Sequence, residues 1–163
     1  MSITSKVSSS FLFVLILVAV LAPWIAPYSY QAQDTFHILA FPGSEHWLGT
    51  DRLGRDLLSR MIYGARVSLF VGVFSTVVAL IIGTIYGTLS AYIGGRIDNL
   101  MMRVVDVVFA LPDLLMIILI TVLMGRGIVG VFIALTLVSW VTIARLVRGE
   151  VLRIKEYPYI QAA

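Results

Sequence analysis

Few residues in this chain have the side-chain types and the spacing that catalysis or metal binding requires. Cysteine is absent from the 163 residues, which removes disulfides, thiolate nucleophiles and cysteine-ligated metals. The two histidines, His37 and His46, lie nine residues apart in a polar segment, a poor spacing for a zinc site. Asp106 and Asp113 are seven residues apart, about 10 Å along a helix, which is too far to share a proton as an aspartyl dyad does. The sequence therefore predicts no catalytic residue, no metal site and no cofactor.

The short motifs of nucleotide-dependent and hydrolytic enzymes point the same way. The chain lacks G-x-x-x-x-G-K-[ST], so ATP hydrolysis would reside in another protein, and it lacks G-x-S-x-G and H-E-x-x-H. A literal G-x-G-x-x-G at 125–130 follows an apolar stretch and no βαβ unit, so it predicts a tight turn and not a dinucleotide site. The sequence therefore gives little support to an intramembrane hydrolase, which stays only as an alternative function.

The composition is that of an integral membrane protein. Hydrophobic residues make up 60% of the chain and charged residues 13%, against about a quarter in soluble domains, and the mean hydropathy is +0.98. The net charge of +3 is too small and too dispersed for nucleic acid, so the basic residues are better interpreted as topology signals. We therefore expect an all-α polytopic bundle in a lipid bilayer, with no nucleic-acid partner.

Four apolar stretches are long enough to be spans, at about residues 8–26, 67–93, 107–124 and 128–144. The first is too long for a signal peptide and lacks a clean cleavage site, so we expect an uncleaved span with a cytoplasmic N-terminus. This orientation places seven Lys and Arg residues inside and five outside, a weak agreement with the positive-inside rule.

The second predicted span carries small residues at every fourth position of one helical face. They are Ser75, Ala79, Gly83 and Gly87. In lipid the hydrophobic effect does not press helices together, so close backbone packing must do much of the work. We therefore assign these four residues to helix packing and not to a substrate site.

The third predicted span contains Pro112 and Asp113. The carboxylate lies about 9 Å into the span, where it should face other helices or water because its insertion in lipid is costly. Two interpretations stay open: Asp113 belongs to a cytoplasmic gate, or it is hydrogen-bonded near an N-terminal turn reset by Pro112. Before this span, Arg103 and Asp106 have the spacing of a helical ion pair.

The polar segment 46–66 also has a helical pattern. Its apolar residues recur every four positions, and Asp51 with Arg55 and Asp56 with Arg60 have the spacing of helical ion pairs. The segment therefore predicts an amphipathic helix at the outer membrane surface.

The chain closes on a basic segment. The last apolar run ends at Ala144, and four basic residues follow between Arg145 and Lys155. This is typical of a membrane helix leaving the bilayer on its cytoplasmic side. Pro158 suits the first turn of a new short helix, whose small residues would let another protein approach closely.

These two segments resemble a known family. Residues 145–163 are similar to the start of the EAA loop of bacterial ABC-importer permeases, in particular the dipeptide, oligopeptide and nickel group. The run HWLGTDRLGRDLLSRMIYGARVSL at 46–69 resembles the signature before their second span. The chain departs from the family at Gln161, where Glu is usual, and it stops at Ala163, before the family's last two spans. It therefore looks like the N-terminal part of a longer protein, with four of about six spans.

The resemblance implies roles for two sets of residues. The coupling segment, which in the family sits in a groove of the ATP-binding subunit, would comprise Arg148, Glu150, Lys155, Glu156, Tyr159, Gln161, Ala162 and Ala163. The extracytoplasmic signature would comprise Gly49, Thr50, Asp51, Gly54, Arg55, Asp56, Ser59 and Arg60.

The resemblance further implies one permease half of an ABC importer in the bacterial cytoplasmic (inner) membrane. Residues 1–45 would form an N-terminal span and extracytoplasmic loop, and 46–163 an incomplete transmembrane domain. The implied partners are a second permease subunit, two ATP-binding subunits and an extracytoplasmic substrate-binding protein. A peptide is favoured over nickel, because the sequence shows no cluster of metal-ligating side chains. Nickel or another small solute stays the alternative, and a non-transporting membrane scaffold is a further one.

Overall fold

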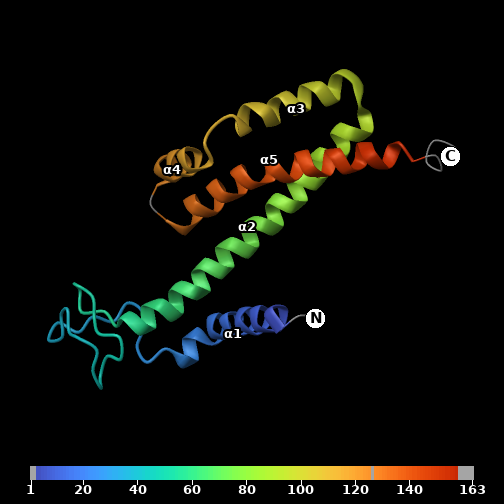
Figure 1. Cartoon of the computed structure of the whole chain (residues 1–163). Helices are drawn as coiled ribbons and strands as arrows, with labels where there is room; N and C mark the ends of the chain where they lie inside the picture. Colours follow the sequence, from blue (N-terminus) through green and yellow to red (C-terminus); the bar gives the residue numbers. More distant parts are fainter. Residues whose placement is uncertain (1–2, 126, 158–163) are drawn as a thin grey trace. The chain divides into compact units, whose positions relative to one another are not determined.

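The computed structural model describes residues 3–125 and 127–157, most of which are helical (Figure 1). The helices are α1 (Ile3–Ile25), α2 (Leu57–Ile93), α3 (Gly95–Phe109), α4 (Asp113–Met124) and α5 (Ile128–Lys155). Within the described residues no strand forms, and Thr50 and Asp56 make an isolated β-bridge. The predicted all-α fold is confirmed.

The number of membrane spans depends on how a bent helix pair is counted. By length and hydropathy, three stretches could cross a bilayer alone: Thr4–Ile25, Leu57–Ile93 and Ile128–Lys155. α3 and α4 pass the same test together but are bent by 84° at the break between them. The described residues thus hold three candidate spans, or the predicted four if this pair is one span.

The bend corrects the prediction of a single third span at 107–124. Proline has no backbone N–H and disfavours the helical conformation of the residue before it. α3 accordingly ends at Phe109, and α4 begins after Pro112, which is its N-cap. The predicted pairing of Arg103 with Asp106 is replaced by a tertiary one, because Arg145 Nη2 lies 2.7 Å from Asp106 Oδ1.

The predicted amphipathic helix at 46–66 is wrong in its first half. α2 begins at Leu57, and the residues before it form turns. Gly49 and Gly54 have φ of 76° and 70°, a conformation that glycine adopts readily and that a right-handed helix excludes. A Cβ at Gly54 would collide with the backbone of Asp34, so these turns also let two loop segments approach closely.

The predicted ion pairs of segment 46–66 change with the loss of that helix. Asp51 pairs with Arg60 instead of Arg55, whose backbone N–H donates to Asp51 Oδ1 over 3.0 Å. Asp56 does not pair with Arg60, because its Oδ2 accepts the N–H of Ser59 over 2.7 Å at the start of α2.

By its internal contacts the chain divides into two compact units, residues 1–70 and 71–163. In the second unit α3 and α4 both pack along α5 (Figure 1). Its core contains Val105, Val141 and Ala144, which are almost fully buried. Tyr86 and Trp140 pack against this core with their rings 5.0 Å apart, edge to face, a favourable aromatic geometry.

The fourth predicted span ends too early. α5 continues beyond Ala144 as one helix to Lys155, so the basic segment extends the apolar one without a break. Glu150 and Arg153 pair over 2.8 Å at i, i+3 within this extension. Thus the start of the predicted coupling segment is rigidly continuous with a helix that packs against α3 and α4.

Candidate functional site

The small residues of α2 lie on a buried face. Ser75, Ala79, Gly83 and Gly87 are all buried. A Cβ at Gly83 would lie 2.7 Å from Trp140 O, and one at Gly87 would lie 3.0 Å from the backbone N of Arg148. The backbones of α2 and α5 therefore meet at these two glycines, with no room for a side chain.

The basic extension of α5 ends in a polar cluster at the turn between α2 and α3. We call Ser90, Asp98, Arg148 and Lys155 the Asp98 cluster. Arg148 donates from Nε to Asp98 Oδ1 and from Nη2 to Asp98 Oδ2, each over 2.6 Å. This two-point geometry is the strong form of a carboxylate–guanidinium pair. Ser90 Oγ donates to Asp98 Oδ1 over 2.5 Å, so α2, α3 and α5 meet at one buried carboxylate.

Lys155 completes the Asp98 cluster from the last turn of α5. Its Nζ donates to Ala91 O over 2.7 Å and to Tyr92 O over 2.9 Å. These carbonyls belong to the last turn of α2, where backbone acceptors lack helical partners and the helix dipole favours a cation. The ammonium thus caps α2 and holds the end of α5 against it.

A second, more exposed link joins α5 to α3. The Arg145 guanidinium pairs with Asp106 and also stacks 4.0 Å from the centre of the Phe109 ring. Arg145, Arg148 and Lys155 of α5 thus all form ion pairs or hydrogen bonds with residues of α2 or α3. The arrangement ties the three helices together, because α5 is linked to α2 through Lys155 and to α3 through Arg145 and Arg148.

The structure reaches only part of the predicted coupling segment. Arg148 and Lys155 belong to the Asp98 cluster, Glu150 pairs with Arg153, and Glu156 is the C-cap of α5. The remaining members lie outside the described residues: Tyr159, Gln161, Ala162 and Ala163.

Asp113 is the first residue of α4 and is exposed. Its negative charge suits a helix N-terminus, and no side-chain cap hydrogen bond is made there. The structure does not bring Asp113 together with the Asp98 cluster or with another predicted site residue.

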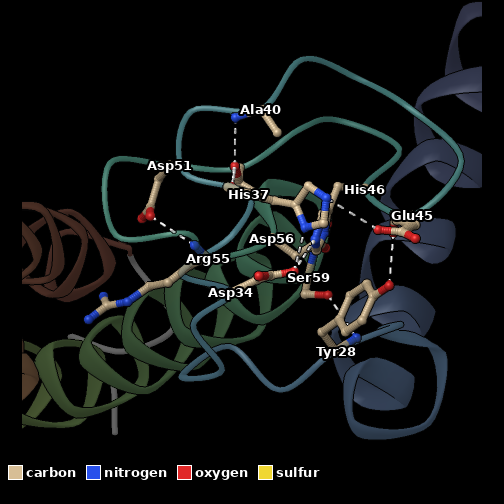
Figure 2. Close-up of polar contacts among 11 residues, drawn as sticks. Tyr28, Asp34, His37, Ala40, Glu45, His46, Asp51, Arg55, Asp56 and Ser59 are labelled. Carbon is tan, nitrogen blue, oxygen red and sulfur yellow. Dashed lines mark hydrogen bonds and ion pairs between the residues drawn. The ribbon is translucent and has the colours of Figure 1, made fainter.

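The predicted extracytoplasmic signature folds into the loop before α2 and its first turn (Figure 2). Thr50 Oγ1 accepts the N–H of Ala40 over 2.9 Å and donates to the carbonyl of His37, which ties two loop segments together. Ser59 is fully buried, and its Oγ accepts the N–H of Tyr28 over 3.1 Å. The signature residues therefore shape this loop from within.

Hydrogen bonds lower the pKa of two aspartates of the loop, Asp51 and Asp56. The hydrogen bond from the Arg55 N–H, with that from Leu53 and the charge of Arg60, lowers the pKa of Asp51 although partial burial opposes this. For Asp56, burial favours the neutral form most strongly, but hydrogen bonds from Ser59 and His46 outweigh it and lower the pKa.

The loop also gathers residues that sequence spacing kept apart. We call Asp34, His37, Glu45, His46 and Asp56 the histidine cluster (Figure 2). His37 Nδ1 lies 2.7 Å from Asp34 Oδ2, and His46 Nδ1 lies 3.0 Å from Asp56 Oδ1. The hydrogen bond to Asp34 raises the pKa of His37. The turns at Gly49 and Gly54 pack closely on the backbones of Ala40 and Asp34 in this loop. The spacing of the five residues along the sequence did not predict that they would form a cluster.

Comparison with known proteins matches both ends of the chain to transport permeases. The family described as "Binding-protein-dependent transport system inner membrane component" matches residues 79–163. A second, described as "N-terminal TM domain of oligopeptide transport permease C", matches residues 4–42.

Individual relatives extend the similarity over nearly the whole chain. The dipeptide transport system permease protein DppC of Bacillus subtilis (strain 168) is 46% identical over 162 residues, which are 98% of this chain and 51% of the relative. The oligopeptide transport system permease protein OppC of the same organism is 42% identical over 149 residues, 91% of this chain and 49% of the relative. The glutathione transport system permease protein GsiD of Pectobacterium atrosepticum is 42% identical over 155 residues, 93% of this chain and 52% of the relative.

The chain spans about half the length of the curated relatives it matches. Its apolar helices and these matches make it a multi-pass inner-membrane protein. The chain belongs to the family of binding-protein-dependent transport system inner membrane components.

Proposed function

We propose that this chain forms part of a permease subunit in an ABC importer of peptides. The observation that carries the proposal is the 46% identity to a dipeptide permease over 98% of the chain. The relatives are named for dipeptide, oligopeptide and glutathione transport, and we extend the peptide class to this chain. Residues 1–45 would be its N-terminal span and loop, and 46–163 the first part of its transmembrane domain.

The proposal assigns a side of the membrane to each polar region. With the N-terminus in the cytoplasm, the loop before α2 faces outward and the Asp98 cluster lies at the cytoplasmic surface. The contact between Arg148 and Asp98 supports placing the α2–α3 turn and the end of α5 on one side, and the resemblance of residues 148–163 to a coupling loop is our reason for making that side the cytoplasmic one. In this orientation a substrate-binding protein would approach the outer loop.

Coupling to ATP hydrolysis would enter at residues 148–163. Partner ATP-binding subunits would contact this segment, and a second permease subunit would complete the translocation path. α5 is one helix of 28 residues, about 42 Å long, so a displacement at its end moves the apolar part as well. The Asp98 cluster would pass the same displacement to α2 and α3. The path would then alternate in its exposure to the two sides of the membrane.

The test is uptake by proteoliposomes that contain the full-length protein, its partner permease and its ATPase subunits. With the binding protein supplied outside, we expect ATP-dependent uptake of a labelled dipeptide that unlabelled peptides inhibit and Ni²⁺ does not. Uptake of Ni²⁺ without peptide uptake would contradict the peptide assignment. Failure of the full-length protein and its partner permease to assemble with their ATPase subunits would contradict the importer assignment itself.

A further inference from the structure

The geometry of the histidine cluster points to a binding site for a divalent transition-metal ion of the Zn²⁺ type, with Asp34, His37 and His46 as ligands. We propose this site in addition to the transport function. Each of the three residues offers one ligand atom, and the three atoms lie within 4.8 Å of one another. Histidine nitrogen and carboxylate oxygen are ligands that Zn²⁺ accepts in tetrahedral sites.

The separations are close to those that an ion requires. Tetrahedral bonds of about 2.05 Å place ligand atoms about 3.3 Å apart. His46 Nε2 lies 3.8 Å from Asp34 Oδ2. His37 Nδ1 and Asp34 Oδ2, at 2.7 Å, share a proton that an ion would replace. The two distances to Asp34 Oδ2, 2.7 Å and 3.8 Å, lie on either side of that tetrahedral separation, so rotation of the two imidazoles would bring the ligand atoms around one ion.

The buried histidine is already oriented as a metal ligand. The His46 side chain is 8% exposed, and its Nδ1 faces Asp56 Oδ1, whose side chain is 2% exposed. With Nδ1 hydrogen-bonded to Asp56, the tautomer of His46 that binds a metal would carry its proton on Nδ1 and present the Nε2 lone pair on the side of Asp34. A carboxylate behind the histidine is the usual outer partner of a zinc-bound imidazole, and Asp56 is itself held by the Ser59 N–H.

Charge and space also favour a cation here. The histidine cluster combines three carboxylates with two imidazoles, so its acidic groups outnumber its basic ones. A cavity of about 360 Å³ is lined by Tyr28, Asp34, Glu45, His46 and Asp56 among others, which leaves room beside the ligands. A water molecule would complete the shell.

A bound ion would join two parts of the loop before α2. Asp34 and His37 lie on one turn, His46 lies beyond an intervening segment, and Asp56 immediately precedes α2. The ion would therefore restrain the loop against the first turn of a membrane helix. The expected consequence is a Zn²⁺-dependent rise in thermal stability that grows with the concentration of free metal.

The test uses the full-length protein in detergent, purified with a tag that contains no histidine and stripped with a chelator. Calorimetric titration with Zn²⁺ should show one ion bound per chain, and titration with Mg²⁺ should show none. His37→Ala and His46→Gln should each lower the Zn²⁺ affinity tenfold or more, and Asp56→Asn should lower it about 10–100-fold. Asp106→Asn, which removes an exposed carboxylate elsewhere, should leave the affinity unchanged.

His37→Ala is the decisive variant, because its side chain is 46% exposed and its removal should not impair folding. Gel filtration checks that each variant stays monodisperse. The visible spectrum of bound Co²⁺ should be tetrahedral in the unmodified protein and absent in His37→Ala. No Zn²⁺ binding by the unmodified protein, or equal affinity in a monodisperse His37→Ala, would overturn the site.

Discussion

Gly87→Ala tests the contact between α2 and α5 with a single methyl group. A Cβ at Gly87 would meet only backbone: the carbonyl of Ala144, and the amide N of Arg148 at 3.0 Å. Backbone atoms in a packed helix cannot rotate away, so the two helices must separate. Overpacking of this kind costs about 1–3 kcal/mol.

The matched control is Gly72→Ala on the same helix, where a Cβ would meet nothing within 4 Å. Both substitutions gain the same helix propensity, about 1 kcal/mol, so their difference isolates the packing. Gly87→Ala should therefore be less stable than Gly72→Ala by about 1–3 kcal/mol, or about fivefold to 150-fold in the folding equilibrium constant.

The assay is reversible unfolding of the full-length protein by SDS in mixed micelles, followed by tryptophan fluorescence. Trp140 packs on Tyr86 near the contact and should report its loss. Gly83→Ala should behave as Gly87→Ala does, because its Cβ would lie 2.7 Å from Trp140 O. Equal stability of the Gly87 and Gly72 variants would refute the close approach of α2 and α5.

Three further predictions address the polar regions. Asp98→Asn should destabilise the protein by about 1.5–3 kcal/mol and reduce uptake per ATP hydrolysed, because Arg148 loses its charged partner. Asp106→Asn, in the exposed pair with Arg145, should cost under about 1 kcal/mol, and equal SDS-unfolding midpoints for the two variants would contradict this difference. The pKa of Asp51 is lowered from 3.8, so its stabilisation of the loop is present above that value and is lost as the pH falls through the folded-state pKa. The hydrogen-exchange protection factors of residues 50–56, which correct for the intrinsic pH dependence of exchange, should therefore fall in acid less steeply in Asp51→Asn, and identical profiles would argue against the hydrogen bonds described. Ser44→Cys should react with a membrane-impermeant thiol reagent in intact cells and Arg153→Cys only after permeabilisation, and the reverse pattern would invert the proposed orientation.

Hydropathy predicted the existence of the helices well, but it predicted the residues at which they begin and end less well. Charge-free apolar runs located α1, α2 and α5, because a bilayer requires such lengths. The break at Pro112 was visible in the sequence, but its 84° bend was not, because flanking packing on α5 sets the direction. The apolar periodicity of segment 46–66 was misleading before Leu57, since glycines at positive φ at 49 and 54 override it.

The polar contacts were the least predictable part. Asp98 and Arg148 are 50 residues apart, and no local pattern singles out Asp98 or Ser90. Arg148 was chosen for its place in a segment that resembles a coupling loop, not for this carboxylate. His37 and His46 were likewise too far apart in sequence to indicate a site, and they come together through the tertiary folding of the loop, in which Gly49 packs on the backbone of Ala40 and Gly54 on that of Asp34.

The claim that residues 148–163 couple this permease to ATP hydrolysis is tested most directly by Ala162→Trp in the full-length protein. A large side chain in a packed groove should cost about 1–3 kcal/mol. The measurement is pull-down of the ATPase subunits, with peptide uptake recorded on the same preparation. We predict that ATPase association falls about fivefold to 150-fold and uptake is lost, while membrane insertion stays normal. Full association with full uptake would contradict the assignment of this segment as the coupling element.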